Sequence, residues 1–217
     1  MILLGLTGGI AMGKSTAAAG FRSYGVPVFD ADLAVHRLFA PGGAAVAPVA
    51  AAFPGCLGPN GGVDRAALGR RVFDDPAALR RLEGIVHPLV RAAERRFLAR
   101  AAARGQPLVV IDVPLLFETG GERRVDAVAV VSAPAVLQEQ RALRRPGMDR
   151  TRLAAVRARQ ISDAEKRRRA DFVIPTGLGR RPMLDAIGRI VATLRAAAAA
   201  PSGHNHRYKN HVTSWVS

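Results

Sequence analysis

The 217-residue sequence has few of the residues on which several protein classes depend. It has one cysteine, Cys56, so it cannot form an internal disulfide, and no cysteine and histidine group has the spacing of a zinc site. Aromatic residues make up only 5%, so a core must consist mainly of aliphatic side chains. No apolar run approaches the ~18 residues that span a bilayer. No basic segment precedes the apolar start, so we expect a soluble, cytoplasmic protein without a signal peptide.

Lysine is also scarce, although the chain is strongly basic. The formal net charge is +15, and lysine occurs only at positions 14, 166 and 209, so arginine supplies nearly all of the positive charge. Such an excess is typical of a nucleic-acid surface or of a site for a small polyanion. A GC-rich genome would also produce an alanine- and arginine-rich chain, and both explanations stay open. Because arginine supplies almost every other positive charge, a lysine at position 14 indicates that this position requires lysine in particular.

The segment LTGGIAMGKST at positions 6–16 contains the pattern G-x-x-x-x-G-K-[ST], formed by Gly8, Gly13, Lys14 and Ser15. It follows a predicted strand and opens a predicted helix, which is the setting of a P-loop. A glycine-rich turn lets several backbone N–H groups converge on phosphate oxygens, and the helix N-terminus adds the positive end of its dipole. We expect a nucleoside triphosphate site in which the lysine reaches the β- and γ-phosphates and the serine hydroxyl binds Mg²⁺. The predicted nucleotide-binding residues are Gly8, Gly9, Ala11, Met12, Gly13, Lys14, Ser15 and Thr16.

Short apolar runs alternate with helical patterns along the chain, which predicts an α/β fold with a parallel sheet. The predicted strands are 2–6, 26–29, 108–112, 125–131 and 171–174. The predicted helices are 14–24, 31–39, 64–73, 77–104, 134–145, 149–160 and 181–199. About eighty residues separate the second strand from the third, too many for one crossover, so we expect a helical insertion on the sheet.

An acidic pair, Asp30 and Asp32, follows the second predicted strand in the segment VFDAD. Small-molecule kinases of this architecture place carboxylates there, where one can accept the proton of an attacking hydroxyl. The alternative is that one aspartate only caps the helix that follows. A GTPase would need the guanine-reading sequence N-K-x-D, which does not occur. A mechanical ATPase is harder to exclude, but the chain is short and has no apparent sensor region.

The sequence resembles the dephospho-CoA kinases over residues 2–198. The resemblance rests on GLTGGIAMGKST, VFDADLAVH, VDRAALGRRVF, HPLV, VPLLFE, Q…R…R…Q and ADFVI, which occur in the family's order. It implies transfer of the ATP γ-phosphate to the ribose 3′-hydroxyl of dephospho-CoA, the last step of coenzyme A synthesis. It also implies a P-loop NTPase core at 1–30, 106–135 and 170–200, a substrate-binding helical insertion at 31–105 and an arginine-rich lid at 136–169. The tail, 201–217, is polar and is predicted to be disordered.

Residue roles follow from the same resemblance. Asp32 corresponds to the general base, and Asp112 is placed to support Mg²⁺ through water, with Glu118 as a weaker candidate. The predicted metal residues are therefore Ser15 and Asp112. The predicted substrate-binding residues are Thr7, Asp30, Asp32, Arg65 and His87. Arg65 has the alternative of a surface residue at a helix start, and His87 that of marking a helix break before Pro88.

The predicted lid is the most charge-dense segment. Positions 141–169 contain eleven basic and three acidic residues, a net charge of +8. Arg141 and Arg145 are four residues apart on a predicted helix, so they share a face and are the predicted catalytic arginines beside Lys14 and Asp32. Arginine suits this role because its planar fork binds phosphate oxygens bidentately. Gln160 completes the lid signature, and we expect the other basic residues, Lys166 to Arg169 included, to be solvated.

Two positions depart from the family pattern. Ala11 and Met12 replace the commoner Gly-Ser in the loop, which is compatible with the fold if Ala11 avoids a positive φ angle. Pro175 and Thr176 stand where an asparagine near the adenine is frequent, so base contacts there would use the backbone.

Two other function classes remain possible. A nucleic-acid-binding P-loop protein would explain the charge, but the arginine-rich segment lacks the aromatic residues on which bases stack. Another small-metabolite kinase, such as a nucleoside monophosphate kinase, would differ in which acceptor consumes ATP. We expect a small-molecule substrate, no membrane and no nucleic-acid partner.

Overall fold

The computed structural model describes residues 1–73 and 75–200, which divide into two compact units. The core unit comprises residues 1–28 and the described residues from 101 onward, and the helical unit comprises Phe29–Arg100. The predicted disordered tail lies outside the described residues. The elements in chain order are β1 Ile2–Gly8, α1 Lys14–Ser23, β2 Val28–Asp30, α2 Ala31–Phe39, α3 Val46–Ala52, α4 Arg65–Val72, α5 Pro76–Ala103, β3 Leu108–Asp112, η1 Gly121–Arg124, β4 Ala127–Ser132, α6 Ala135–Leu143, α7 Arg150–Ala158, α8 Asp163–Arg169, β5 Phe172–Pro175 and α9 Arg180–Ala199.

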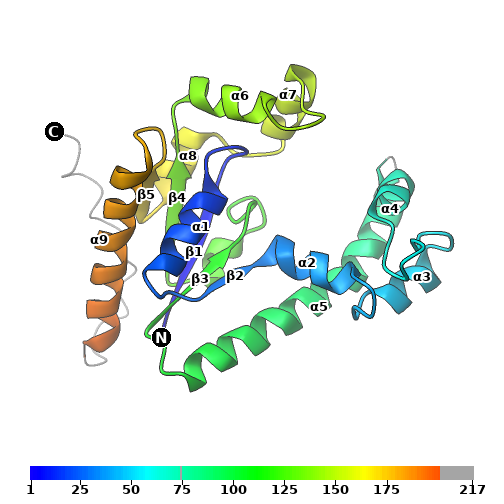
Figure 1. Ribbon diagram of the computed structural model, residues 1–217, viewed down its shortest axis with the longest axis horizontal. Helices are drawn as coiled ribbons and strands as arrows, with labels where there is room; N and C mark the ends of the chain where they lie inside the picture. Colours follow the sequence, from blue (N-terminus) through cyan, green and yellow to red (C-terminus); the bar gives the residue numbers. More distant parts are fainter. Residues whose placement is uncertain (74, 201–217) are drawn as a thin grey trace. The chain divides into compact units, whose positions relative to one another are not determined.

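The strands form one five-stranded sheet in the order β2-β3-β1-β4-β5 (Figure 1). The pairs β1–β3, β1–β4 and β4–β5 are parallel, with Leu4 opposite Val110 on one side and Ala127 on the other. The predicted α/β fold with a five-stranded parallel sheet is confirmed, and each predicted strand is within two residues of the observed one. In a sheet of this kind the carboxyl ends of all strands lie at one edge, where ligands bind.

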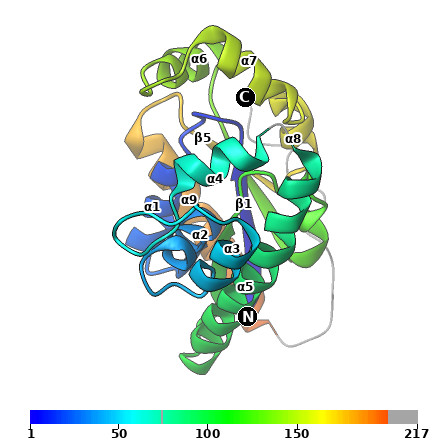
Figure 2. The same cartoon turned by 90° about the vertical axis from the view of Figure 1, so that its right-hand side faces the viewer.

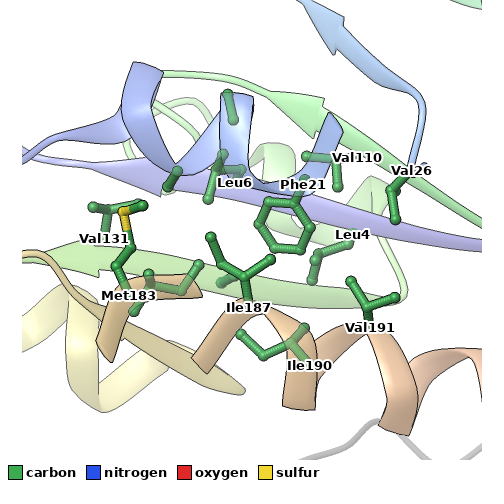
Figure 3. Close-up of a cluster of buried hydrophobic side chains, with 14 of the residues drawn as sticks. Leu4, Leu6, Phe21, Val26, Val110, Val131, Met183, Ile187, Ile190 and Val191 are labelled. Atoms are coloured by element: carbon green, nitrogen blue, oxygen red, sulfur yellow. The ribbon is translucent and has the colours of Figure 1, made fainter. Parts of the chain in front are cut away.

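Helices α1 and α9 cover one face of the sheet. α9 buries residues at the helical spacing of three and four, among them Met183, Ile187, Ile190 and Leu194. They pack with Phe21 of α1 and with alternate residues of the strands, as Figure 3 shows. The intervening strand residues point to the opposite face. A second cluster forms there from Leu116, Phe117, Val128, Val130 and Ala170.

Helices α6 and α7 lie side by side beyond the carboxyl end of β4, as Figures 1 and 2 both show. This part of the core unit has its own small apolar cluster, in which Ala142 of α6 and Leu153 of α7 pack with Ala11. The P-loop and the predicted lid are therefore joined by packed side chains.

The helical unit has a separate core. Residues of α2, α3, α4 and α5 contribute to it, and Figure 2 shows these four helices gathered together. The helix α3 was not predicted, since its sequence VAPVAAA contains Pro48 and has no polar N-cap. α5 runs without interruption through Pro88, so His87 does not mark a helix break.

Among the residues that the structure describes, no helix combines the length and apolar character needed to cross a membrane.

Candidate active site

The P-loop turns from β1 into α1 through residues 9–13. Gly13 has a φ angle of 90°, a left-handed conformation that favours glycine. At Gly8 the constraint is space, because a Cβ atom there would lie 2.7 Å from the carbonyl oxygen of Val131. The first turn of α1 has no acidic residue, and no side chain caps it. Its N–H groups and its dipole therefore suit an anion, which is what the sequence pattern predicts.

Ala11 differs from expectation, because its φ angle is 58°. An alanine in the left-handed region costs about 1 kcal/mol or more relative to glycine, so the surrounding structure must hold this turn. The side chains of Ala11 and Met12 are buried, and the N–H of Ala133 donates to the Met12 sulfur at 3.2 Å. Contacts of these two residues with a nucleotide would come from their backbone.

Lys14 and Asp112 form the central ion pair of the site. The Lys14 ammonium donates to Oδ1 of Asp112 at 2.5 Å, and the side chain of Asp112 is only 3% exposed. Asp112 ends β3 and Lys14 begins α1, so the parallel pairing of β1 with β3 brings them together. The carboxylate fixes the lysine where the loop closes. Ser15 and Thr16 are exposed in the first turn of the helix.

Two threonines near the loop have structural contacts. Thr7 is fully buried, and its hydroxyl donates to the carbonyl oxygen of Pro114 at 3.1 Å. The hydroxyl of Thr176 lies 2.6 Å from the carbonyl oxygen of Met12. Nη2 of Arg141 donates to the carbonyl oxygen of Thr176 at 2.8 Å. Arg141 therefore supports the segment behind the loop.

Arg145 does not lie on the same helix as Arg141. α6 ends at Leu143, whereas the sequence predicted a helix over 134–145. Pro146 follows, and a proline disfavours helical geometry in the residue before it. The side chain of Arg145 is exposed beyond the helix end. The shared helical face was the wrong reason to pair these arginines, and the catalytic role of Arg145 stays a prediction.

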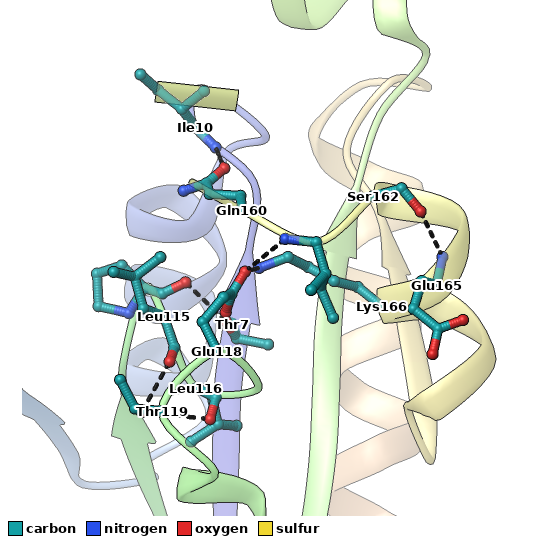
Figure 4. A network of polar contacts seen from close by, with 12 residues as sticks. Thr7, Ile10, Leu115, Leu116, Glu118, Thr119, Gln160, Ser162, Glu165 and Lys166 are labelled. Carbon is teal, nitrogen blue, oxygen red and sulfur yellow. Dashed lines mark hydrogen bonds and ion pairs between the residues drawn. The ribbon is translucent and has the colours of Figure 1, made fainter. Parts of the chain in front are cut away.

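Glu118 and Lys166 form a second ion pair, at 2.7 Å (Figure 4). The Lys166 side chain is 1% exposed, so the expectation of a solvated lysine was wrong. Glu118 also accepts a hydrogen bond from the N–H of Ile161 at 3.0 Å. These contacts attach α8 to the segment after β3. The sequence contained a signal for α8, because Ser162 and Glu165 have capping-box spacing and Ser162 does cap the helix.

Two glutamines of the predicted lid contact the P-loop directly. Nε2 of Gln138 donates to the carbonyl oxygen of Ile10 at 2.9 Å, and Oε1 of Gln160 accepts from the Ile10 N–H at 3.1 Å. Arg157 in turn donates to Oε1 of Gln138 at 2.7 Å. The resemblance named Gln160 only as part of a signature, and no sequence pattern indicated that its partner is the loop backbone.

The helical unit carries the remaining candidates. Asp30 caps α2, since its carboxylate accepts from the N–H of Leu33 at 2.9 Å. Asp32, in the first turn of α2, is exposed, as is His87 on α5. The alternative that one aspartate of the pair is a cap therefore applies to Asp30 and leaves Asp32 available.

Arg65 is the first residue of α4, and its guanidinium lies 2.5 Å from Nε2 of His36. Asp64 caps the same helix. Hydrogen bonds from the N–H groups of Ala67 and, more weakly, Ala66 lower the pKa of the Asp64 carboxyl, although desolvation opposes them. A fixed cap thus sets the position from which Arg65 extends.

In the described part of the chain, no three histidine, cysteine, aspartate or glutamate side chains are grouped as a metal site would require. Mg²⁺ commonly binds through one or two protein groups, several waters and the phosphates of a nucleotide. The Ser15 hydroxyl, beside the uncapped helix terminus, fits that mode.

This chain is similar in sequence to known dephospho-CoA kinases. The sequence model of the dephospho-CoA kinase family matches residues 2–178. A dephospho-CoA kinase of Paramagnetospirillum magneticum is 64% identical over 204 residues, which cover 94% of this chain and 96% of that protein. One of Rhodospirillum rubrum is 52% identical over 97% of this chain and 100% of that protein.

Solved structures show the same fold. A crystal structure from Thermus thermophilus matches with a TM-score of 0.77 and 37% identity, over 88% of this chain and 96% of that one. A dephospho-CoA kinase from Campylobacter jejuni matches with a TM-score of 0.63 over the same shares of the two chains, at 23% identity.

Proposed function

Because this chain belongs to the dephospho-CoA kinase family, we propose that it transfers the γ-phosphoryl group of ATP to the ribose 3′-hydroxyl of dephospho-CoA, the last step of coenzyme A synthesis. The observation that carries this proposal is that one chain combines a family match over residues 2–178 with a P-loop lysine already fixed by a buried carboxylate. The family match and the relatives reported above give no support to a nucleoside monophosphate kinase or a nucleic-acid-binding protein.

The nucleotide would bind at the P-loop, and ATP supplies the phosphoryl group. The loop from Gly8 to Thr16 offers backbone N–H groups at an uncapped helix terminus. Lys14 is held beside them by Asp112. A fixed positive charge is worth more in a phosphoryl-transfer site than a mobile one, because it needs no rearrangement as charge develops.

Mg²⁺ would be held by the Ser15 hydroxyl, with Asp112 acting through water. Asp112 already binds the Lys14 ammonium, so it would serve both positive charges from one buried position. Carboxylate and hydroxyl oxygens are the ligands that Mg²⁺ prefers.

The acceptor would meet the exposed residues of the helical unit. Asp32 is the proposed general base, since its carboxylate is free of the capping role that Asp30 performs. Arg65 and His87 are exposed and are proposed to bind the acceptor, together with the segment around Thr7. Arg145 is proposed to meet the transferring phosphoryl group when the lid closes. Arg141 is proposed to support the P-loop from behind, through its hydrogen bond to the carbonyl oxygen of Thr176. We also propose that the protein works in the cytoplasm.

An assay of ADP release tests the proposal. Purified protein is given ATP and Mg²⁺ with dephospho-CoA, AMP, CMP, shikimate or pantothenate, one at a time. Only dephospho-CoA should drive ADP release, chelation of Mg²⁺ should stop it, and the product should carry phosphate at the 3′ position by ³¹P NMR. The Lys14→Met variant is the matched blank. ADP release driven by another acceptor, and not by dephospho-CoA, would overturn the assignment.

A further inference from the structure

Ile10 of the P-loop is held from two sides by residues of the predicted lid. Gln138 of α6 donates to its carbonyl oxygen, and Gln160, which follows α7, accepts from its N–H. Arg157 of α7 donates to the other end of the Gln138 amide. Gln138 is only 7% exposed, so its amide makes these bonds away from solvent. Figure 4 shows the contact between Gln160 and Ile10.

The chemistry of the partners fixes the orientation of both amides. The carbonyl oxygen of Ile10 can only accept, so Gln138 must present its NH₂ group to it. Arg157 can only donate, so the oxygen of the same amide must face the guanidinium. The N–H of Ile10 can only donate, so Gln160 must present its oxygen. Gln138 thus acts as both donor and acceptor, whereas Gln160 acts on the loop only as an acceptor.

These bonds fix the two peptide units that flank Ile10. The carbonyl held by Gln138 belongs to the unit that leads into Ala11, and the orientation of that unit determines the φ angle of Ala11. That angle is 58°, a conformation that alanine rarely adopts without support from its surroundings. The P-loop of this chain therefore depends on contacts from outside the loop.

We propose that Gln138 and Gln160 are positioning residues that clamp the Ile10 backbone, hold the P-loop in its phosphate-binding shape and couple α6 and α7 to the bound triphosphate. The clamp acts through Ile10 and needs no contact of either glutamine with substrate. Its effect on catalysis rests on the proposed kinase function, but its effect on loop shape does not.

The same two substitutions at each position test the proposal. Methionine has nearly the shape of glutamine and makes neither bond. Glutamate keeps an acceptor and loses the donor. Gln160→Glu should therefore bind ADP more tightly than Gln160→Met does, because the Ile10 N–H keeps its hydrogen-bond acceptor. Gln138→Glu should bind ADP no more tightly than Gln138→Met does, because a carboxylate cannot donate to the Ile10 carbonyl. Gln140→Glu and Gln140→Met are the matched controls, since Gln140 lies on α6 and is exposed.

Two measurements can be made without dephospho-CoA or any other phosphoryl acceptor. The first is hydrogen exchange of the Ile10 amide by NMR in nucleotide-free protein. We expect exchange to be about tenfold faster in Gln160→Met and unchanged in Gln160→Glu and in both position-140 controls. The second is ADP affinity by calorimetry, which we expect to fall about fivefold or more in Gln160→Met, Gln138→Met and Gln138→Glu. Activity should then show a larger rise in KM for ATP than loss of kcat, with an unchanged Tm.

The proposal is overturned if Gln160→Met keeps the wild-type exchange rate at Ile10. It is overturned equally if the ADP affinity of Gln160→Glu is no higher than that of Gln160→Met, or if that of Gln138→Glu exceeds that of Gln138→Met. It is also overturned if Tm falls in step with ADP affinity, which would indicate a merely structural role. A wild-type protein that phosphorylates no dephospho-CoA would contradict the proposed function and leave the exchange result standing.

Discussion

The core unit and the helical unit present their candidate residues in opposite ways. In the core unit several polar side chains near the P-loop are paired with protein groups, as Lys14 with the buried Asp112 and Gln138 with Ile10 and Arg157. In the helical unit Asp32 and His87 are exposed on helices. The core-unit residues proposed to bind the nucleotide are therefore held in place by folding itself. The side chains of Asp32 and His87, which are proposed to act on the acceptor, are exposed to solvent, so a ligand would have to order them.

The difference has a physical cause. Parallel strands bring their carboxyl ends to one edge, and polar groups gathered there under covering segments lose water, so each needs a partner. A residue on the exposed face of a helix has no such requirement. Removing one partner of a buried ion pair should therefore lower stability, whereas replacing an exposed candidate residue should change activity alone.

The largest expected effect is that of Asp32→Asn in the helical unit. Loss of the proposed general base should lower kcat by roughly 10²–10⁴, with ATP affinity and Tm nearly unchanged because the side chain is exposed. Steady-state kinetics and a thermal melt measure this. The matched control is Asp75→Asn, since Asp75 caps the start of α5 and asparagine caps equally well. A variant that keeps more than about half of the wild-type rate would place the base elsewhere.

The next effect is one of stability, in the core unit. Glu118→Gln would leave the Lys166 ammonium buried without a counter-charge, which costs about 3 kcal/mol. For a domain of this size we expect Tm to fall by roughly 6–12 °C. The control is Glu139→Gln, which removes an exposed ion pair with Arg150 and should change Tm little.

A double variant sharpens the same test. Glu118→Leu with Lys166→Met removes both charges, and it should be more stable than Glu118→Gln because no buried charge is left unpaired. If the single variant is as stable as the wild type, the pair is solvated in solution and the contrast between the two units fails there.

Arg145→Ala is expected to lower activity moderately and to leave stability unchanged. The side chain is exposed beyond the end of α6, so Tm should not change. If it meets the transferring phosphoryl group, kcat should fall by about 10- to 100-fold, more than KM for ATP rises. Arg144→Ala, at the neighbouring exposed position, is the control. A raised KM with unchanged kcat would show that Arg145 only helps to bind the nucleotide.

Most of the fold could be predicted from the sequence, because local patterns specify it. The apolar run at 108–112 and the amphipathic pattern at 31–39 match β3 and α2 at both ends. The P-loop was recognisable because local geometry requires its glycines. Gly13 has a positive φ angle, and Gly8 packs too closely against its neighbours to carry a Cβ atom. The helix α8 was missed although Ser162 and Glu165 signalled its start.

The contacts of the site were far less predictable. Lys166 lies in a run of charged residues, and only tertiary packing places it against Glu118. The bonds from Gln138 and Gln160 to Ile10 join positions more than a hundred residues apart, and they act on backbone atoms, which leave no trace in side-chain patterns. Ala11 adopts a left-handed conformation for which its own chemistry gives no reason.

The smallest expected effect concerns Asp64, whose cap positions the start of α4 beside Arg65. The bonds from the N–H groups of Ala67 and Ala66 lower the pKa of its carboxyl in the folded protein. Its contribution to stability is therefore present above the ordinary pKa of about 3.8 and is lost as pH falls through the lower, folded value. Asp64→Ala should lower Tm slightly at pH 7 and at pH 5, and the difference from wild type should shrink below about pH 3.8. Asp64→Asn keeps a neutral cap, so its Tm difference from Asp64→Ala should not depend on pH. A wild-type advantage over Asp64→Ala that stays constant down to the most acid pH tested would show that the charge of the carboxylate does not contribute, and that the cap acts through its hydrogen bonds alone.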